Sequence, residues 1–99
     1  MRISFERTGG FAGTRLTTIV DTATLPIEEA NHLHQLVKAA DFFHLPTTIT
    51  SPTSQPDRFQ YKLVVEAKSR QHTVNVSEQA VPDALKLLIE WLLEAARRR

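Results

Sequence analysis

The chain has 99 residues, which suffice for one hydrophobic core but not for two independent ones. Its 12 Lys and Arg residues almost balance its 11 Asp and Glu residues, so the formal net charge of +1 gives no electrostatic reason to expect a nucleic-acid partner. The chain contains no cysteine, which excludes disulfide bonds, thiolate metal sites and a thiol nucleophile. We expect a single domain over residues 1–99 whose stability comes from packing alone.

The first twenty residues predict a β-hairpin. Ile3 and Phe5 alternate with polar neighbours, and the alternation returns from Leu16 to Val20. This period of two is typical of strands with one buried face. The segment RTGGFAGTR between the two strands is therefore expected to be the hairpin loop.

That loop contains every glycine of the chain, namely Gly9, Gly10 and Gly13. Glycine adopts positive φ angles without a steric penalty, so a sharp turn is expected here. Phe11 and Ala12 then lie at the tip of the loop. An exposed phenylalanine is unfavourable unless it folds back onto the domain or packs into a partner, and the sequence leaves both alternatives open.

A first helix is predicted from Pro26 to about Asp41. Proline is favoured at the first helical position, and Glu28 and Glu29 place negative charge where the helix dipole prefers it. The apolar residues that follow at helical spacing are Ala30, Leu33, Leu36, Val37 and Ala40. We expect this stripe to cover one face of the sheet.

The segment from Phe42 to Arg58 predicts a long surface connection. It carries three prolines and many Thr and Ser residues, which favour extended, irregular backbone. We expect Phe42, Phe43 and Leu45 to pack along the core.

The second half of the chain repeats the plan of the first. Alternation from Phe59 to Val65 and from Gln71 to Val76 predicts a second hairpin, and Pro82 is expected to open a last helix. The apolar stripe of that helix comprises Val81, Leu85, Leu88, Trp91, Leu92 and Ala95. We expect this stripe, Trp91 included, to be core.

These elements together predict an α+β domain of order ββαββα, with a four-stranded antiparallel sheet and both helices on one face. A shift of 56 residues (82 − 26) places Pro26 on Pro82 and Leu36 on Leu92, which suggests a duplicated ββα unit. The other face of the sheet should be exposed to solvent and accessible to a partner. The side chains expected on that face include Arg2, Ser4, Gln60, Lys62 and Glu66.

No pattern in the chain predicts catalysis or a metal site. His32 and His34 point about 200° apart on a helix, and the other two histidines, His44 and His72, lie in other elements. The serines lack a GxSxG setting, and no lysine follows the glycine-rich loop at the spacing of a phosphate-binding loop. We expect neither an enzyme nor a cofactor.

The start of the chain shows no targeting signal. Met1 leads directly into the first strand pattern without a long apolar segment. We therefore expect neither a signal peptide nor a transmembrane helix, and no membrane partner. The lack of cysteine suits a reducing compartment, so we expect a cytoplasmic protein.

The N-terminal pattern ISFERTGGFAGTRL resembles that of the emfourin family, bacterial protein inhibitors of thermolysin-like metalloproteases such as protealysin. The segments VKAADFF, DRFQYKLVVE and VPDALKLLIEWLLEAARR are also similar in order and spacing. The resemblance implies a monomeric inhibitor that blocks the active-site cleft of such a protease and needs no cofactor of its own, because the zinc belongs to the target.

Two loops are candidates for entering the protease. The first is the tip formed by residues 9–13, with Phe11 as an apolar anchor; the second is the turn Ala23–Ile27, with Leu25 as the anchor. Thermolysin-like proteases hold substrates as extended strands and favour an apolar side chain after the scissile bond, which either loop can mimic. The alternative from another class is a non-inhibitory adaptor that binds a protein through the exposed sheet face or edge.

Overall fold

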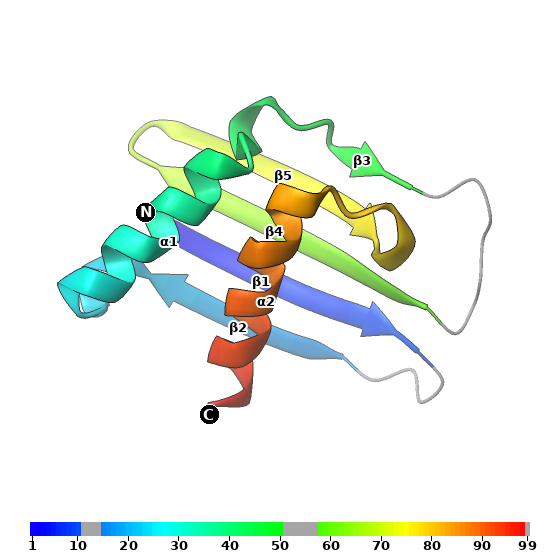
Figure 1. Cartoon of the computed structure of the whole chain (residues 1–99), viewed down its shortest axis with the longest axis horizontal. Helices are drawn as coiled ribbons and strands as arrows, with labels where there is room; N and C mark the ends of the chain where they lie inside the picture. Colours follow the sequence, from blue (N-terminus) through cyan, green and yellow to red (C-terminus); the bar gives the residue numbers. More distant parts are fainter. Residues whose placement is uncertain (11–14, 51–57, 99) are drawn as a thin grey trace.

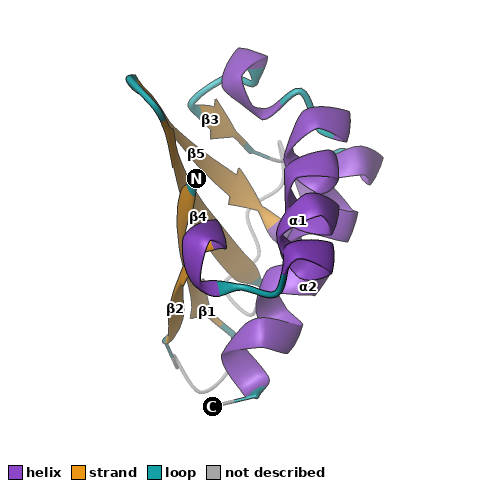
Figure 2. Cartoon of the chain, turned by 90° about the vertical axis from the view of Figure 1, so that its left-hand side faces the viewer, coloured by secondary structure: helices purple, strands orange, loops and turns teal. Residues whose placement is uncertain are grey.

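The computed structural model describes residues 1–10, 15–50 and 58–98. Within these ranges the chain forms an α+β fold with two helices on one face of a five-stranded sheet (Figures 1 and 2). The strands are β1 (Arg2–Gly9), β2 (Leu16–Asp21), β3 (Thr48–Ile49), β4 (Phe59–Ala67) and β5 (Arg70–Ser77), and the helices are α1 (Ile27–Ala39) and α2 (Asp83–Arg97). Short 3₁₀ helices cover Thr22–Thr24, Phe42–His44 and Glu78–Ala80. Neither helix is long and apolar enough to cross a membrane.

The sheet is mixed, so the prediction of a four-stranded antiparallel sheet was wrong in this detail. The strand order is β2-β1-β4-β5-β3, and β3 pairs with β5 in the parallel sense. Thr48 and Ile49 lie opposite Asn75 and Val76, and the Asn75 N–H donates to the carbonyl of Thr47 at 2.8 Å. A strand of two residues is too short to show alternation, which is why the sequence predicted only a connection here.

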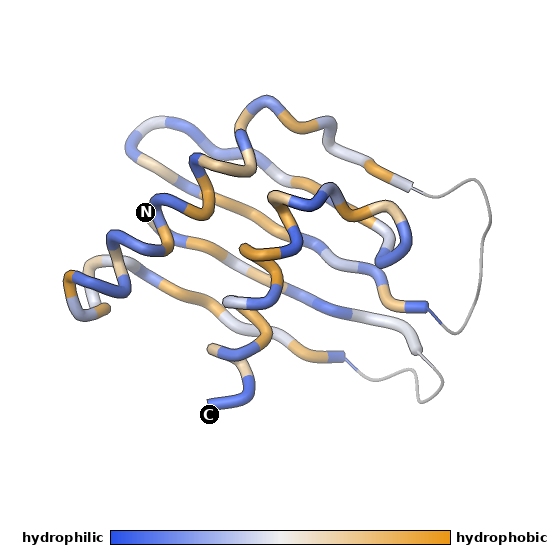
Figure 3. The backbone as a smooth tube through the Cα atoms, viewed as in Figure 1, coloured by the Kyte–Doolittle hydropathy of each residue, from blue (hydrophilic) through white to orange (hydrophobic). Residues whose placement is uncertain are grey.

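The inner face of the sheet carries the core. Its fully buried side chains are Ile3 and Phe5 of β1, Leu63 and Val65 of β4, and Val74 and Val76 of β5. The predicted alternation of these strands is confirmed, and Figure 3 shows the apolar stretches along their middle parts. From α2, Leu85, Leu88 and Leu92 pack on this face with no exposed area. The hydrophobic effect over this interface is the main stabilising contribution.

The first helix follows the predicted stripe. Leu33, Leu36 and Val37 are buried, whereas most of the charged and polar side chains of α1 are exposed. Pro26 lies directly before the first helical residue, one position earlier than predicted, and Pro82 does the same before α2. The helix ends at Ala39, and Asp41 then adopts a left-handed conformation with φ of 50° that reverses the chain.

The connection after α1 packs on the core as expected. Phe42 is 1% exposed, while Phe43 and Leu45 are partly buried against the core. The rings of Phe42 and His72 meet edge to face at 5.7 Å, and Nε2 of His72 lies 2.7 Å from the carbonyl oxygen of Leu45. These contacts attach the segment to β5 and hold β3 against the sheet.

Two neighbouring leucines of α2 test this assignment of the core. Replacing Leu88, which is fully buried, by alanine should lower the free energy of unfolding by about 2–5 kcal/mol, because it leaves a cavity. The same change at Leu87, which is 56% exposed, should alter it by less than about 0.5 kcal/mol. Urea unfolding followed by circular dichroism measures both, and equal losses would contradict the assignment.

Candidate functional site

The two predicted contact loops lie at opposite ends of the hairpin formed by β1 and β2. Gly9 ends β1, and Leu25 follows β2 after one 3₁₀ turn (Figure 1). The six residues of β2 separate the two ends by about 20 Å, at about 3.3 Å per residue. The structure therefore does not bring the two candidates together. Phe11, Ala12 and Gly13 lie outside the described residues.

The glycine end of the hairpin is shaped by close backbone approach. Gly9 and Gly10 have φ angles of 98° and 80°. A Cβ atom on Gly9 would lie 2.6 Å from the carbonyl oxygen of Arg58, and one on Gly10 would lie 2.8 Å from the Phe59 ring. Both glycines are therefore required by the fold itself, independently of any partner.

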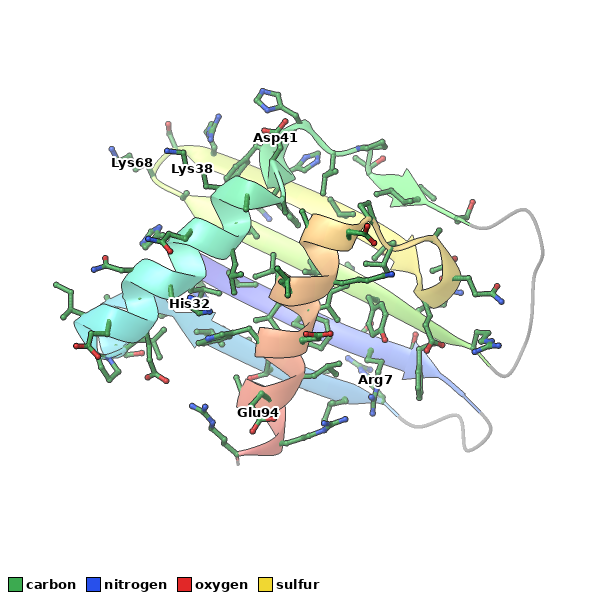
Figure 4. The ribbon with its side chains drawn as sticks, in the orientation of Figure 1. Arg7, His32, Lys38, Asp41, Lys68 and Glu94 are labelled. Atoms are coloured by element: carbon green, nitrogen blue, oxygen red, sulfur yellow. The ribbon has the colours of Figure 1, made fainter. Side chains whose placement is uncertain are left out.

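Side chains from three elements support this end of the sheet. The guanidinium of Arg7 stacks on the Phe59 ring at 4.3 Å, and the Phe59 N–H donates to the Glu78 carboxylate at 3.1 Å. Figure 4 places Arg7 near the end of β1 that leads into the glycine-rich loop. The contacts hold the start of β4 against β1 and against the turn after β5.

Tyr61 lies beside this group on the inner face. It is 8% exposed and stacks on Phe5 with ring centroids 5.9 Å apart. Burial raises the pKa of the Tyr61 hydroxyl above its ordinary value of 10.0, the negative charge of Glu78 raises it further, and the positive charge of Arg7 lowers it. A phenol in this setting stays neutral at physiological pH.

The other end of the hairpin carries a turn that is fixed by local hydrogen bonds. The Asp21 carboxylate accepts from the Ala23 N–H at 2.9 Å, the Thr24 hydroxyl donates to the Asp21 carbonyl at 2.8 Å, and the Leu25 N–H donates to the Thr22 carbonyl at 3.3 Å. A side chain that binds its own backbone two residues on is typical of a rigid turn.

The same turn is attached to the N-terminus. The N–H and the hydroxyl of Thr22 both donate to the Met1 carbonyl, at 2.9 and 3.1 Å, and the Met1 ammonium group donates to the Thr22 hydroxyl at 3.1 Å. The turn therefore cannot shift without moving Met1, the residue directly before β1, and it is preorganised before any partner binds.

Leu25 and Ile27 differ in how the turn presents them. Leu25 is partly buried and packs against the core, whereas Ile27 is 76% exposed. Sequence reasoning chose Leu25 as the anchor and overlooked Ile27. At about 100° per residue, Ile27 falls off the apolar stripe of α1, which is the signal that predicts its exposure. Leu25 and Pro26 are both extended, with ψ angles of 153° and 147°.

A groove of about 240 Å³ lies beside this turn, between β2 and the end of α2. Leu25, Trp91 and Ala95 form its apolar part, and the ion pair between Arg98 and Glu29, 3.2 Å apart, joins α2 to α1 at its margin. Trp91 was predicted to be core, but it is only partly buried and lines this groove. Its stripe position put it on the correct side of α2, but α2 reaches the margin of the sheet there.

The histidines do not converge. His32 is exposed on α1 (Figure 4), and Nδ1 of His44 lies 2.6 Å from the Asp41 carboxylate. Within residues 1–10, 15–50 and 58–98, no three or more His, Asp or Glu side chains are grouped so that they could hold a metal ion.

Comparison with protein families gives one match that covers most of the chain. A family model named Emfourin matches residues 5–93, from β1 to the middle of α2, and so includes both candidate loops. The chain belongs to the emfourin family. The resemblance seen in the sequence is thereby confirmed over nearly the whole chain. No curated protein and no solved structure gives a significant match. Emfourins are an inhibitor family, which is consistent with a binding role for this chain.

The hydroxyl of Tyr61 offers a direct test of the site in this emfourin. Tyr61 is the single tyrosine of the chain, so the rise in absorbance at 295 nm with increasing pH reports on its ionisation alone, because Trp91 does not titrate. We expect a titration midpoint above 10 in the folded protein and near 10 in denaturant, because burial disfavours the phenolate. The contribution of Tyr61 to stability should be constant up to pH of about 10 and should then fall until its folded pKa is passed, since the unfolded chain releases the proton first. A folded midpoint at or below the denatured one would contradict the described environment.

Proposed function

We propose that this emfourin inhibits thermolysin-like zinc metalloproteases, protealysin-like enzymes among them, by occupying their active-site cleft. The observation that carries this proposal is the family match over residues 5–93. The protein acts through binding alone and needs no cofactor, since the catalytic zinc belongs to the protease. We propose a cytoplasmic location, in keeping with the lack of cysteine, and a monomer.

The turn Ala23–Ile27 is the element that we place in the cleft. The Ala23 N–H and the Thr24 hydroxyl donate to Asp21, and the preceding Thr22 donates to Met1. These hydrogen bonds fix the shape of the turn, so docking costs little conformational entropy. Leu25 and Pro26 supply a short extended segment of the kind that a protease binds as substrate, and Ile27 adds an exposed apolar side chain next to it.

The same turn has features that oppose its own cleavage. A protease needs extended backbone on both sides of the scissile bond, whereas Thr22–Thr24 is a 3₁₀ helix and α1 begins at Ile27. Only two residues are extended, and one of them is Pro26, which lacks an N–H. The reacting atoms are thus held away from the geometry of attack, which is costly for catalysis but not for binding.

The glycine-rich tip remains the second candidate loop. Gly9 and Gly10 are required by contacts with Arg58 and Phe59, so their presence in the family pattern does not by itself indicate a protease contact. Phe11, with Ala12 and Gly13 around it, remains a candidate anchor on the strength of its sequence alone.

Inhibition itself is measured with a fluorogenic peptide and thermolysin or a bacterial relative, with the purified protein titrated in. We expect stoichiometric loss of protease activity that added zinc does not restore, because the inhibitor occupies the cleft and does not remove the metal. Full activity at micromolar protein across several such proteases would contradict the proposal.

Single alanine variants locate the contacting loop. Leu25→Ala and Ile27→Ala should each raise the inhibition constant by about tenfold or more, which is about 1.4 kcal/mol, if the turn is the anchor. Phe11→Ala should then have little effect, and the reverse pattern would assign the glycine-rich tip. Leu87→Ala is the matched control, because Leu87 is an exposed leucine in another part of the fold. Unchanged inhibition by the variants at 11, 25 and 27, with thermal unfolding intact, would reject both loops.

The second candidate function is a non-inhibitory adaptor that binds a protein through the outer sheet face. A hollow of about 350 Å³ favours it, since Ser4 lies between the apolar side chains of Ile19 and Val64 in that region. Ile19 is 49% exposed, which is high for a large apolar residue of a strand. This function becomes the preferred one if the protease assay gives no inhibition.

A further inference from the structure

Among the described residues, the two edge strands of the sheet differ in length. The sheet ends in β2, with six residues, on one side and in β3, with two residues, on the other. The sequence of β2, LTTIVD, has four consecutive β-branched residues and neither proline nor lysine. Folded proteins usually protect edges with short strands, prolines or lysines, because an open edge pairs readily with another chain. The unprotected edge of β2 is therefore a candidate for pairing with another chain.

The pattern of hydrogen bonds between β1 and β2 shows which backbone groups of β2 point away from β1. The Thr22 N–H donates to the carbonyl of its partner Met1, so this pair is a hydrogen-bonded one. Because pairs alternate along an antiparallel ladder, Val20 and Thr18 also bond to β1, and the N–H and C=O groups of Ile19 and Thr17 point away from it. These two residues offer four hydrogen-bonding groups to a further strand.

Helix α2 lies beside this edge, on the inner face of the sheet. Its C-terminal end projects past β2 in both views of the molecule (Figures 1 and 2). The groove described above lies between this end of α2 and the edge, lined by residues 18–21 of β2 on one side and by Trp91 and Ala95 on the other. A strand added next to β2 would place one of its side chains in the groove, over the small Ala95.

We propose that β2 pairs with an extended segment of the target protease, which adds to the sheet as a further strand and inserts an apolar side chain between Leu25 and Trp91. This inference rests on the proposed inhibition. Because β2 runs directly into the turn Ala23–Ile27, one continuous stretch of chain supplies both contacts. Main-chain pairing provides affinity that does not depend on the partner's sequence, whereas the groove selects the side chain.

A second copy of the chain fits this edge less well. Two β2 strands paired around a two-fold axis would carry their helices on the same face, so the two projecting ends of α2 would meet. Each end carries Arg97, and the like charges would repel one another. A single strand without a helix of its own avoids this repulsion.

Hydrogen exchange of single amides, measured by NMR on the free protein and on its complex with thermolysin, tests the pairing directly. The Ile19 and Thr17 amides should exchange rapidly in the free protein and at least about tenfold more slowly in the complex, because each gains a hydrogen-bond partner. The Ser69 amide, in the exposed turn between β4 and β5, is the control and should not change.

A proline substitution gives an independent readout. Ile19→Pro removes an N–H that β1 does not use, so the fold should persist, whereas the inhibition constant should rise at least about tenfold relative to Ile19→Ala, which keeps the N–H. Thermal unfolding of both variants checks the fold.

The outcomes separate the possible failures. Inhibition with the Ile19 amide still exchanging rapidly would overturn the edge pairing and leave the proposed function intact. Slow exchange in the free protein that depends on concentration, together with a dimer in sedimentation, would assign the edge to a second copy and overturn the inference. Absence of inhibition by any such protease would remove the proposed function, and the edge inference with it.

Discussion

The structure depends on one interface, the packing of α2 on the inner face of the central strands. Leu85, Leu88 and Leu92 meet the alternating apolar side chains of β1, β4 and β5, and none of these leucines is exposed. A shift of any strand by one residue would turn its apolar side chains to solvent, so this burial also determines the strand register. The turn Ala23–Ile27, the edge of β2 and the groove beside Trp91 lie at the margin of this interface.

The turn Ala23–Ile27 and the open edge of β2 both follow from the register of the first hairpin. Pairing of Arg2 with Asp21 brings Met1 beside Thr22, and the hydrogen bonds between them fix the turn. The same pairing directs the backbone of Ile19 outward. Binding affinity can therefore come from rigid, preorganised backbone, which suits a small domain that has no disulfide and no metal-binding constellation in its described parts.

Much of the fold was predictable because its elements are long enough to show a period. The alternation of β1, β2, β4 and β5 and the stripes of α1 and α2 identified these elements, and their order predicted the α+β class. The strand Thr48–Ile49 was not predictable, since two residues have no period and their pairing with β5 depends on how Phe42 packs. The site was harder to predict than the fold. Leu25 was chosen for its apolar character, but its contact with the core and the exposure of Ile27 depend on the position of α1.

The sequence alone determined the longer strands and both helices, the inner and outer faces of most strands and the family, because local periodicity and a family pattern are properties of neighbouring residues. Only the tertiary structure decided which edge of the sheet is open, that Trp91 borders a groove, and that the two candidate loops lie at opposite ends of one hairpin. These features arise where residues far apart in the chain come together, as Leu25 and Trp91 do in lining one groove and Glu29 and Arg98 do in an ion pair. Such meetings are set by the packing of α1 and α2 on the sheet, and no local pattern encodes them.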